Sequence, residues 1–142
     1  MMRNRLAGLA LLASLATVPS AGAEPFTVIV NARVPGRSVS KDTLAQIFLG
    51  RIERWGDGRA IAPVDLSATS AVRASFSKVV LGQSVLGVRG HWLRAMSAGQ
   101  RPPMAYAGDD EVIEFVSKNP GGIGYVSDAT ALPSTVKTVA VQ

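Results

Sequence analysis

Apolar and polar positions along the chain recur with two different periods, which predict β-strands separated by helices. Phe26–Asn31 is rich in β-branched residues and predicts a buried strand. Residues 60–66 predict a second strand, and Pro63 within it favours an edge position or a bulge. Further extended segments are predicted at 100–106, 120–126 and 134–141.

The first helix is predicted between a capping serine and a glycine. Ser40 is a good N-cap residue, and Leu44, Ile47 and Phe48 recur at the spacing of one helix face. Gly50 follows them and is expected at the C′ position that ends the helix. The segment therefore predicts a short helix with one buried face.

Two helices are predicted in the middle of the chain. One begins after Ser70 and is stopped by Gly82, and the other begins at Ser84 and ends near Gly99. The residues expected on their buried faces are Val72, Phe76, Val79 and Val80 in the first, and Val85, Val88, Trp92 and Met96 in the second.

The last helix is predicted over residues 110–119, with Asp109 or Asp110 as its N-cap. Strands and helices thus alternate along the chain, which argues for an α/β fold. We expect a short mixed β-sheet flanked by about four helices, in one domain spanning residues 24–142.

Residues 1–23 have the three parts of a secretory signal peptide. Arg3 and Arg5 precede the apolar run 6–18, and Ala21 and Ala23 form a small-x-small cleavage site. The run is shorter than the roughly 20 residues that a spanning helix needs, which argues against a membrane anchor. We therefore expect cleavage after Ala23 and a periplasmic protein.

The net charge and the absence of cysteine restrict the kinds of function that the sequence supports. The formal net charge is +5, and two of the basic residues, Arg3 and Arg5, lie in the expected signal peptide. No block of Lys and Arg remains, so nucleic-acid binding has no support. The chain has no cysteine, so the domain is held by its core alone and has no thiol for catalysis or metal binding.

Enzymatic and metal chemistry are also poorly supported. His91 is the single histidine and lies inside a helical pattern beside Trp92, where a surface or boundary position is expected. No G-x-S-x-G motif is present, and a zinc site would need several His or Cys ligands. The sequence therefore predicts neither an enzyme nor a protein with a cofactor or metal ion.

One stretch, VDLSATSAVRASF at 64–76, has the pattern of an anion site. An apolar strand is followed by a small polar loop and a helix start, where free N–H groups favour an anion. Ser70 supplies a hydroxyl, and Arg73 in the first turn can add a charge-assisted contact. The alternative is an ordinary N-cap with Arg73 in solvent, and the pattern alone leaves both open.

Three segments in this order resemble the periplasmic phosphate-binding proteins of ABC importers, which have the type 2 periplasmic binding protein fold. They are SKDTLAQIFLGRIERWGDG at 40–58, AIAPVDLSATSAVRASF at 60–76 and DDEVIEFVSKNPGGIGYV at 109–126. The resemblance runs from about Asn31 to Asp128. It implies a non-enzymatic receptor that binds a small oxyanion such as phosphate. We predict that the ligand binds at the helix N-terminus, with Thr69, Ser70 and Arg73 as the ligand-binding residues, of which Ser70 alone matches a ligand residue of the family.

The chain departs from that family in two ways. The importer proteins have two lobes and are about twice as long, whereas this chain resembles one lobe. Ser70 falls on the serine of the family's ligand loop, while Leu66 and not an arginine ends the strand before it. We expect a membrane transporter, a sensor or a porin as the partner, or a homodimer that rebuilds the cleft.

A second function is consistent with the same sequence. A lobe without its mate leaves its cleft-facing surface open, which suits a periplasmic interaction or sensory module that has kept the fold without ligand binding. Exposed apolar patches that include Trp55 or Tyr125 would favour this alternative. A polar pocket near Ser70 would favour the oxyanion receptor.

Overall fold

The computed structural model describes residues 25–142, so the expected signal peptide at 1–23 lies outside the described residues. The strands are β1 Phe26–Asn31, β2 Ser38–Val39, β3 Ala62–Leu66, β4 Met104–Tyr106, β5 Gly122–Ser127, β6 Val136–Thr138 and β7 Ala140–Val141. The helices are α1 Lys41–Phe48, α2 Ala71–Phe76, the π-helical turn η1 Ser77–Leu81, α3 Val85–Ser97 and α4 Asp109–Lys118.

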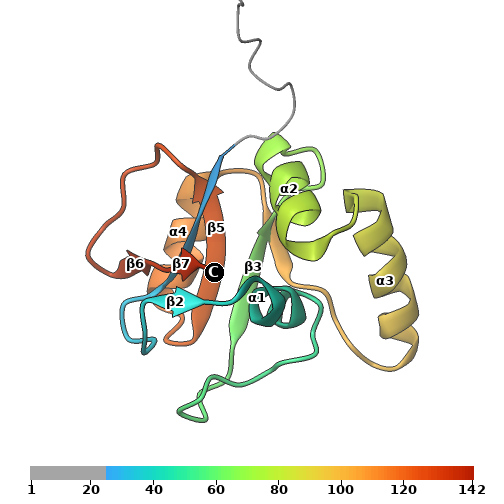
Figure 1. The fold of residues 1–142 in the computed structure, drawn as a ribbon, viewed down its shortest axis with the longest axis horizontal. Coiled ribbons are helices and arrows are strands. Elements are labelled where there is room, and N and C mark those ends of the chain that lie inside the picture. Colours follow the sequence, from blue (N-terminus) through green and yellow to red (C-terminus); the bar gives the residue numbers. More distant parts are fainter. Residues whose placement is uncertain (1–24) are drawn as a thin grey trace, which may run out of the picture.

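The main sheet has the strand order β4-β3-β5-β1-β6 and is mixed. β3 runs parallel to β4 and β5, whereas β1 runs antiparallel to β5 and β6. β2 and β7 form a separate parallel pair. The predicted α/β class, with a mixed sheet and four α-helices, is confirmed (Figure 1).

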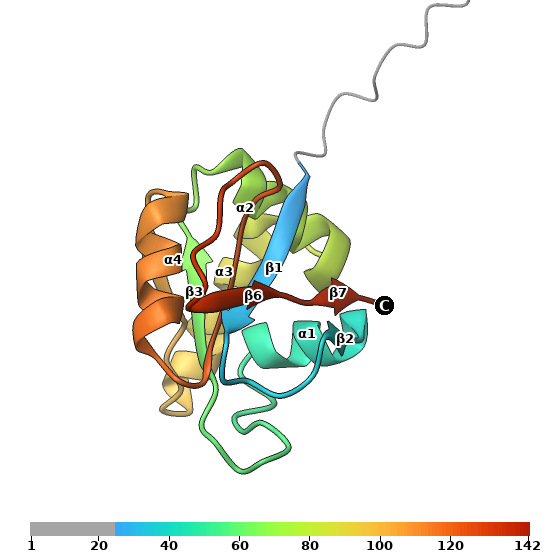
Figure 2. The ribbon, with the colours of Figure 1, turned by 90° about the vertical axis from the view of Figure 1, so that its left-hand side faces the viewer.

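Helices cover both faces of the sheet. Figure 2 shows α4 on one side of β3 and β1 and α1 on the other. β5 separates the two sides, because its side chains alternate between them. A Cβ on Gly124 would meet Val112 and Val116 of α4, whereas the neighbouring Tyr125 ring packs against Phe48 of α1 and Phe76 of α2. No helix within residues 25–142 is long and apolar enough to cross a membrane.

The edge position expected for the second strand is wrong. β3 lies between β4 and β5, so it is an interior strand. Pro63 is tolerated there because the pairing with β4 begins only at Val64, one residue further on. The backbone N–H that Pro63 lacks is therefore missing at a position where β4 does not pair with β3.

The predicted caps are correct for three helices. The hydroxyl oxygens of Ser40, Ser70 and Ser84 each accept a hydrogen bond from a backbone N–H in the first turn. The cap predicted at Asp109 or Asp110 is wrong, because the N-cap of α4 is Gly108. The Asp109 carboxylate instead accepts hydrogen bonds from the Ser127 N–H at the end of β5 and from the Thr130 hydroxyl.

The apolar faces predicted for the two middle helices are correct only in part. Phe76 and Val80 are buried, but Val79 is 44% exposed. The π-helical turn adds residues to each turn and so rotates Val79 away from the core. In α3, Val88 and Trp92 are buried, whereas Met96 is 54% exposed.

Candidate functional site

The polar loop 67–70 lies at the carboxyl end of β3, in the part of the sheet where strands run parallel. Ligands of open α/β sheets bind at this end of the strands. The loop is fixed on its neighbour, since the Ser67 N–H donates to the Tyr106 carbonyl at the end of β4, 2.8 Å away. A rigid backbone at this place is a suitable support for a binding site.

Thr69 and Ser70 present their hydroxyl groups at the start of α2. The Ser70 Oγ accepts from the Arg73 N–H at 3.2 Å, and the Thr69 Oγ1 lies 3.1 Å from the Ser67 Oγ. Ala71 and Val72 begin the helix, so their N–H groups have no acceptor within it. α2 continues directly into η1, so the helical segment extends to Leu81.

The Arg73 side chain does not extend into solvent. The alternative interpretation, an ordinary N-cap, had placed it there. The side chain is only 15% exposed and folds back over the strand end. Nη1 donates to the Leu66 carbonyl at 2.8 Å, and Nε lies 3.4 Å from the Asp65 Oδ1. A guanidinium group has five N–H donors, and these two contacts use two of them.

Asp65 is the buried partner that holds Arg73. Its carboxylate accepts from the Tyr125 hydroxyl and, at 3.1 Å, from the Leu66 N–H. Burial raises the pKa of Asp65 above its usual value, while the Arg73 charge and the two hydrogen bonds act in the opposite direction. Burial and the adjacent carboxylate raise the pKa of Tyr125, which therefore remains a hydroxyl donor.

The sequence analysis did not predict this buried cluster of Asp65, Arg73 and Tyr125. Tyr125 stacks on the Phe76 ring, with 3.9 Å between the centroids and 4° between the planes. This stacking places the hydroxyl beside Asp65. A charged residue inside an otherwise apolar strand was the available signal, since a buried carboxylate needs a partner.

A groove of about 550 Å³ begins beside this cluster and follows α3. Ala68 of the loop and Arg73 of α2 line one part of it. The other lining residues are Val85, Leu86, Arg89, Trp92, Leu93, Met96 and Pro102. The groove therefore joins the predicted anion loop to an apolar wall.

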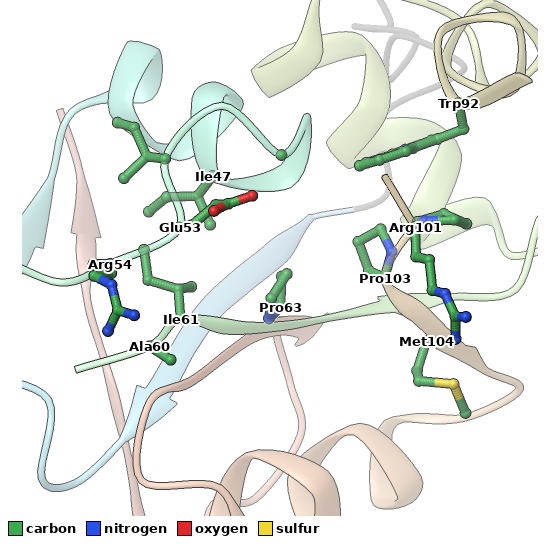
Figure 3. Close-up of a pocket in the computed structure, with 13 residues that line it drawn as sticks. Ile47, Glu53, Arg54, Ala60, Ile61, Pro63, Trp92, Arg101, Pro103 and Met104 are labelled. Atoms are coloured by element: carbon green, nitrogen blue, oxygen red, sulfur yellow. The ribbon is translucent and has the colours of Figure 1, made fainter. Parts of the chain in front are cut away.

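A second pocket, of about 450 Å³, lies at the other end of β3. Figure 3 shows Trp92 at one end of it, Arg54 at the other and Pro63 between them. Glu53 and Arg101 also line it, so its charges have both signs. It contains none of the three predicted site residues, and it lies at the amino end of β3, where such sheets do not usually bind ligands.

His91 has a structural role at the boundary of the core. Its Nε2 lies 3.0 Å from the Leu49 carbonyl oxygen and so joins α3 to the end of α1. Within residues 25–142 there is no cluster of three or more His, Asp or Glu side chains that could hold a metal ion. We take the loop and the groove as the candidate site because Arg73 lines the groove, although Thr69 and Ser70 do not.

Comparison with known proteins identifies relatives of this fold. Residues 18–141 match a family model described as a PBP superfamily domain. An ABC-type phosphate transport receptor from Vibrio cholerae is 21% identical, with a TM-score of 0.64 over 82% of this chain. PstS from Borrelia burgdorferi is 16% identical, also with a TM-score of 0.64 over 82% of this chain. The chain covers 45% and 47% of those two proteins, which is less than half of each.

Proposed function

Because this chain belongs to the PBP superfamily domain family, we propose that it is a periplasmic substrate-binding protein that holds a small oxyanion. Inorganic phosphate is the first candidate, since the two similar structures are a phosphate transport receptor and PstS. The role is that of a receptor and not of an enzyme: the ligand is captured and released unchanged. A membrane transporter, sensor or porin would be the partner that receives it.

The observation that supports this proposal is the fixed position of Arg73. Asp65 and the Leu66 carbonyl hold its guanidinium group at the strand end and use two of its five N–H donors. Because the side chain is already ordered, little further entropy is lost when an anion binds. The hydroxyls of Thr69 and Ser70 complete the proposed site, with the first N–H groups of the helix.

The same geometry predicts modest affinity. Asp65 offsets the charge of Arg73, so the site has donors but little net positive charge. A single open lobe also leaves the bound anion in contact with water, which weakens charge-assisted hydrogen bonds. A second surface, from a partner or another copy of this chain, would strengthen binding by excluding that water.

Calorimetric titration with phosphate, with sulfate as the control anion, tests the proposal. We expect binding at micromolar to millimolar phosphate, and loss of the heat in the Ser70→Ala/Arg73→Ala variant. Ser84→Ala is the matched control, because Ser84 caps α3 in the same way as Ser70 caps α2. The protein should be produced by export, so that its mass also shows whether the chain begins at Glu24.

A folded variant is needed for a clear result. Arg73→Ala leaves the buried Asp65 without its cation, so Arg73→Lys should be measured beside it. Lysine keeps the charge but loses the planar set of donors, and we expect at least tenfold weaker binding. No heat with millimolar phosphate, from a protein with a native circular dichroism spectrum, would contradict the proposal.

That negative result would leave the interaction or sensory module as the alternative. The two residues named for it do not favour it, because Tyr125 is fully buried and Trp55 is half-buried. The Trp55 indole N–H donates to the Gly121 carbonyl at 3.0 Å, so the side chain is part of the domain's own packing.

A further inference from the structure

The groove along α3 points to a more specific ligand than a bare oxyanion. We propose that the anion bound at the loop carries an apolar body, and that this body lies in the groove formed by Leu86, Leu93 and Met96. The substrate class is then an organic oxyanion with a short alkyl or aryl group, such as an alkyl phosphate. This inference rests on the proposed function, because the loop supplies the site for the charged head.

The first argument is the concentration of exposed apolar side chains on one helix. Leu86 is 74% exposed, Leu93 is 60% exposed and Met96 is 54% exposed, and all three line the groove. They recur at a spacing of seven and three residues, so they form one ridge along α3. Figure 1 shows α3 as the outermost helix, on the far side of α2 from β1 and β5. An exposed apolar ridge of this kind marks a surface where a ligand or a partner binds.

The second argument is the charge around that ridge. The sequence has no Asp or Glu between Asp65 and Asp109. Five basic residues lie in this stretch: Arg73, Lys78, Arg89, Arg94 and Arg101. Arg73 and Arg89 line the groove itself. A ligand that is both apolar and anionic is complementary to the apolar side chains and to the arginines of the groove. A neutral or cationic ligand is complementary only to the apolar side chains.

The third argument is the continuity between the loop and the groove. Ala68 lies between Ser67 and Thr69 in the loop and also lines the groove, and Arg73 belongs to both. A head group that binds beside Arg73 and Ala68 therefore lies next to the apolar wall. The volume of about 550 Å³ is in the range of small-molecule sites, and these combine apolar walls with a few polar groups.

A second copy of this chain fits the groove less well. A two-fold interface brings the same patch of each copy together. Arg89 of both copies would then lie in the shared interface, and none of the residues that line the groove is acidic. The charge of the groove thus favours an anionic small molecule over self-association.

The test is calorimetric titration with inorganic phosphate and with butyl, hexyl and octyl phosphate, below micelle-forming concentrations. We expect binding to strengthen about two- to fourfold for each added methylene group, as expected for burial of an alkyl chain. Octanol serves as the probe without a charged head and should bind at least tenfold more weakly than octyl phosphate. Light scattering is measured on the same samples.

Substitutions in the groove distinguish the contribution of the alkyl chain to the affinity from that of the phosphate group. Met96→Gln combined with Leu93→Ser should remove most of the dependence on chain length and leave the affinity for inorganic phosphate unchanged. Met104→Gln is the matched control, because Met104 is 59% exposed and does not line this groove. Ser70→Ala with Arg73→Lys should weaken every phosphate in the series.

Each contrary outcome has a distinct meaning. Equal affinity for phosphate and all alkyl phosphates would overturn this inference and support the proposed function. Binding of octanol as tightly as octyl phosphate, unaffected by Ser70→Ala with Arg73→Lys, would overturn both, because the head would then make no contact. A doubled molar mass that Leu93→Ser returns to the monomer would show that a second copy covers the groove, and would overturn the inference.

Discussion

Helices α4 and α3 both carry apolar residues but use them in opposite ways. α4 buries Val112, Ile113 and Val116 against the sheet and presents charged residues to solvent. α3 is longer and buries only Val88 and Trp92, while its other face exposes leucine and methionine side chains. The helix that supports the fold is thus amphipathic, whereas the helix beside the candidate site is apolar on two faces.

The attachment of α3 to the domain is correspondingly narrow. The Trp92 ring packs over Gly50, where a Cβ would approach it to 2.9 Å. Gly50 has φ 75°, which ends α1 and also leaves room for the ring. The Gln100 side chain donates to the Gly50 carbonyl at 3.1 Å. α3 is therefore anchored along one line, and its opposite face remains available.

The largest expected difference between the two helices is in stability. Ile113→Ala in α4 removes a buried side chain from the core and should lower the free energy of unfolding by about 2 to 5 kcal/mol. Leu93→Ala in α3 should change it by about 0.5 kcal/mol or less, because Leu93 is exposed. Urea denaturation measures both, and comparable losses would show that the α3 ridge is covered in the free protein.

A smaller loss of stability is expected from a substitution beside Asp65, the buried carboxylate on the groove side of the sheet. Tyr125→Phe removes a hydroxyl that donates to the Asp65 carboxylate, and should cost about 1 to 3 kcal/mol at neutral pH. The α4 side of β5 has Gly124 and apolar contacts in the corresponding place. Denaturation of the parent protein and the variant at several pH values measures the loss.

The pH dependence of that loss has a defined sign. The folded-state pKa of Asp65 is raised from its ordinary 3.8, so its contribution to stability is fully present below that value and is lost as pH rises through the folded-state pKa. The Tyr125 hydroxyl bonds to the charged form and lowers this pKa. The deficit of the variant should therefore be largest at neutral pH and shrink near pH 4. A deficit that grows in acid would contradict this account.

The smallest effect concerns the two helix starts. The Ser84 hydroxyl caps α3 by accepting from the Gly87 N–H at 3.0 Å, whereas Gly108 gives α4 no side-chain cap. Ser84→Ala should therefore cost about 1 kcal/mol, measured by the shift of the urea midpoint. Hydrogen exchange of the α3 amides should rise more than that of the α4 amides. Equal acceleration in both helices would show that they unfold as one unit.

The sequence by itself determined the α/β class, the capped starts of three helices and the relationship of a single lobe to the PBP superfamily, which the family match confirms. These features are local: β-branched runs, Ser N-caps and glycine stops act within a few residues. The assignment of Thr69, Ser70 and Arg73 to a ligand stays a prediction.

Only the tertiary structure decided what Arg73 contacts and which apolar residues are buried. Asp65 and Tyr125 meet only because β3 and β5 pair side by side, although they are 60 positions apart. Met96 has the helical spacing of a core residue, but nothing in the spacing says that α3 lies at the periphery. Burial depends on what packs against a helix face, and that is fixed by contacts between segments distant in the chain.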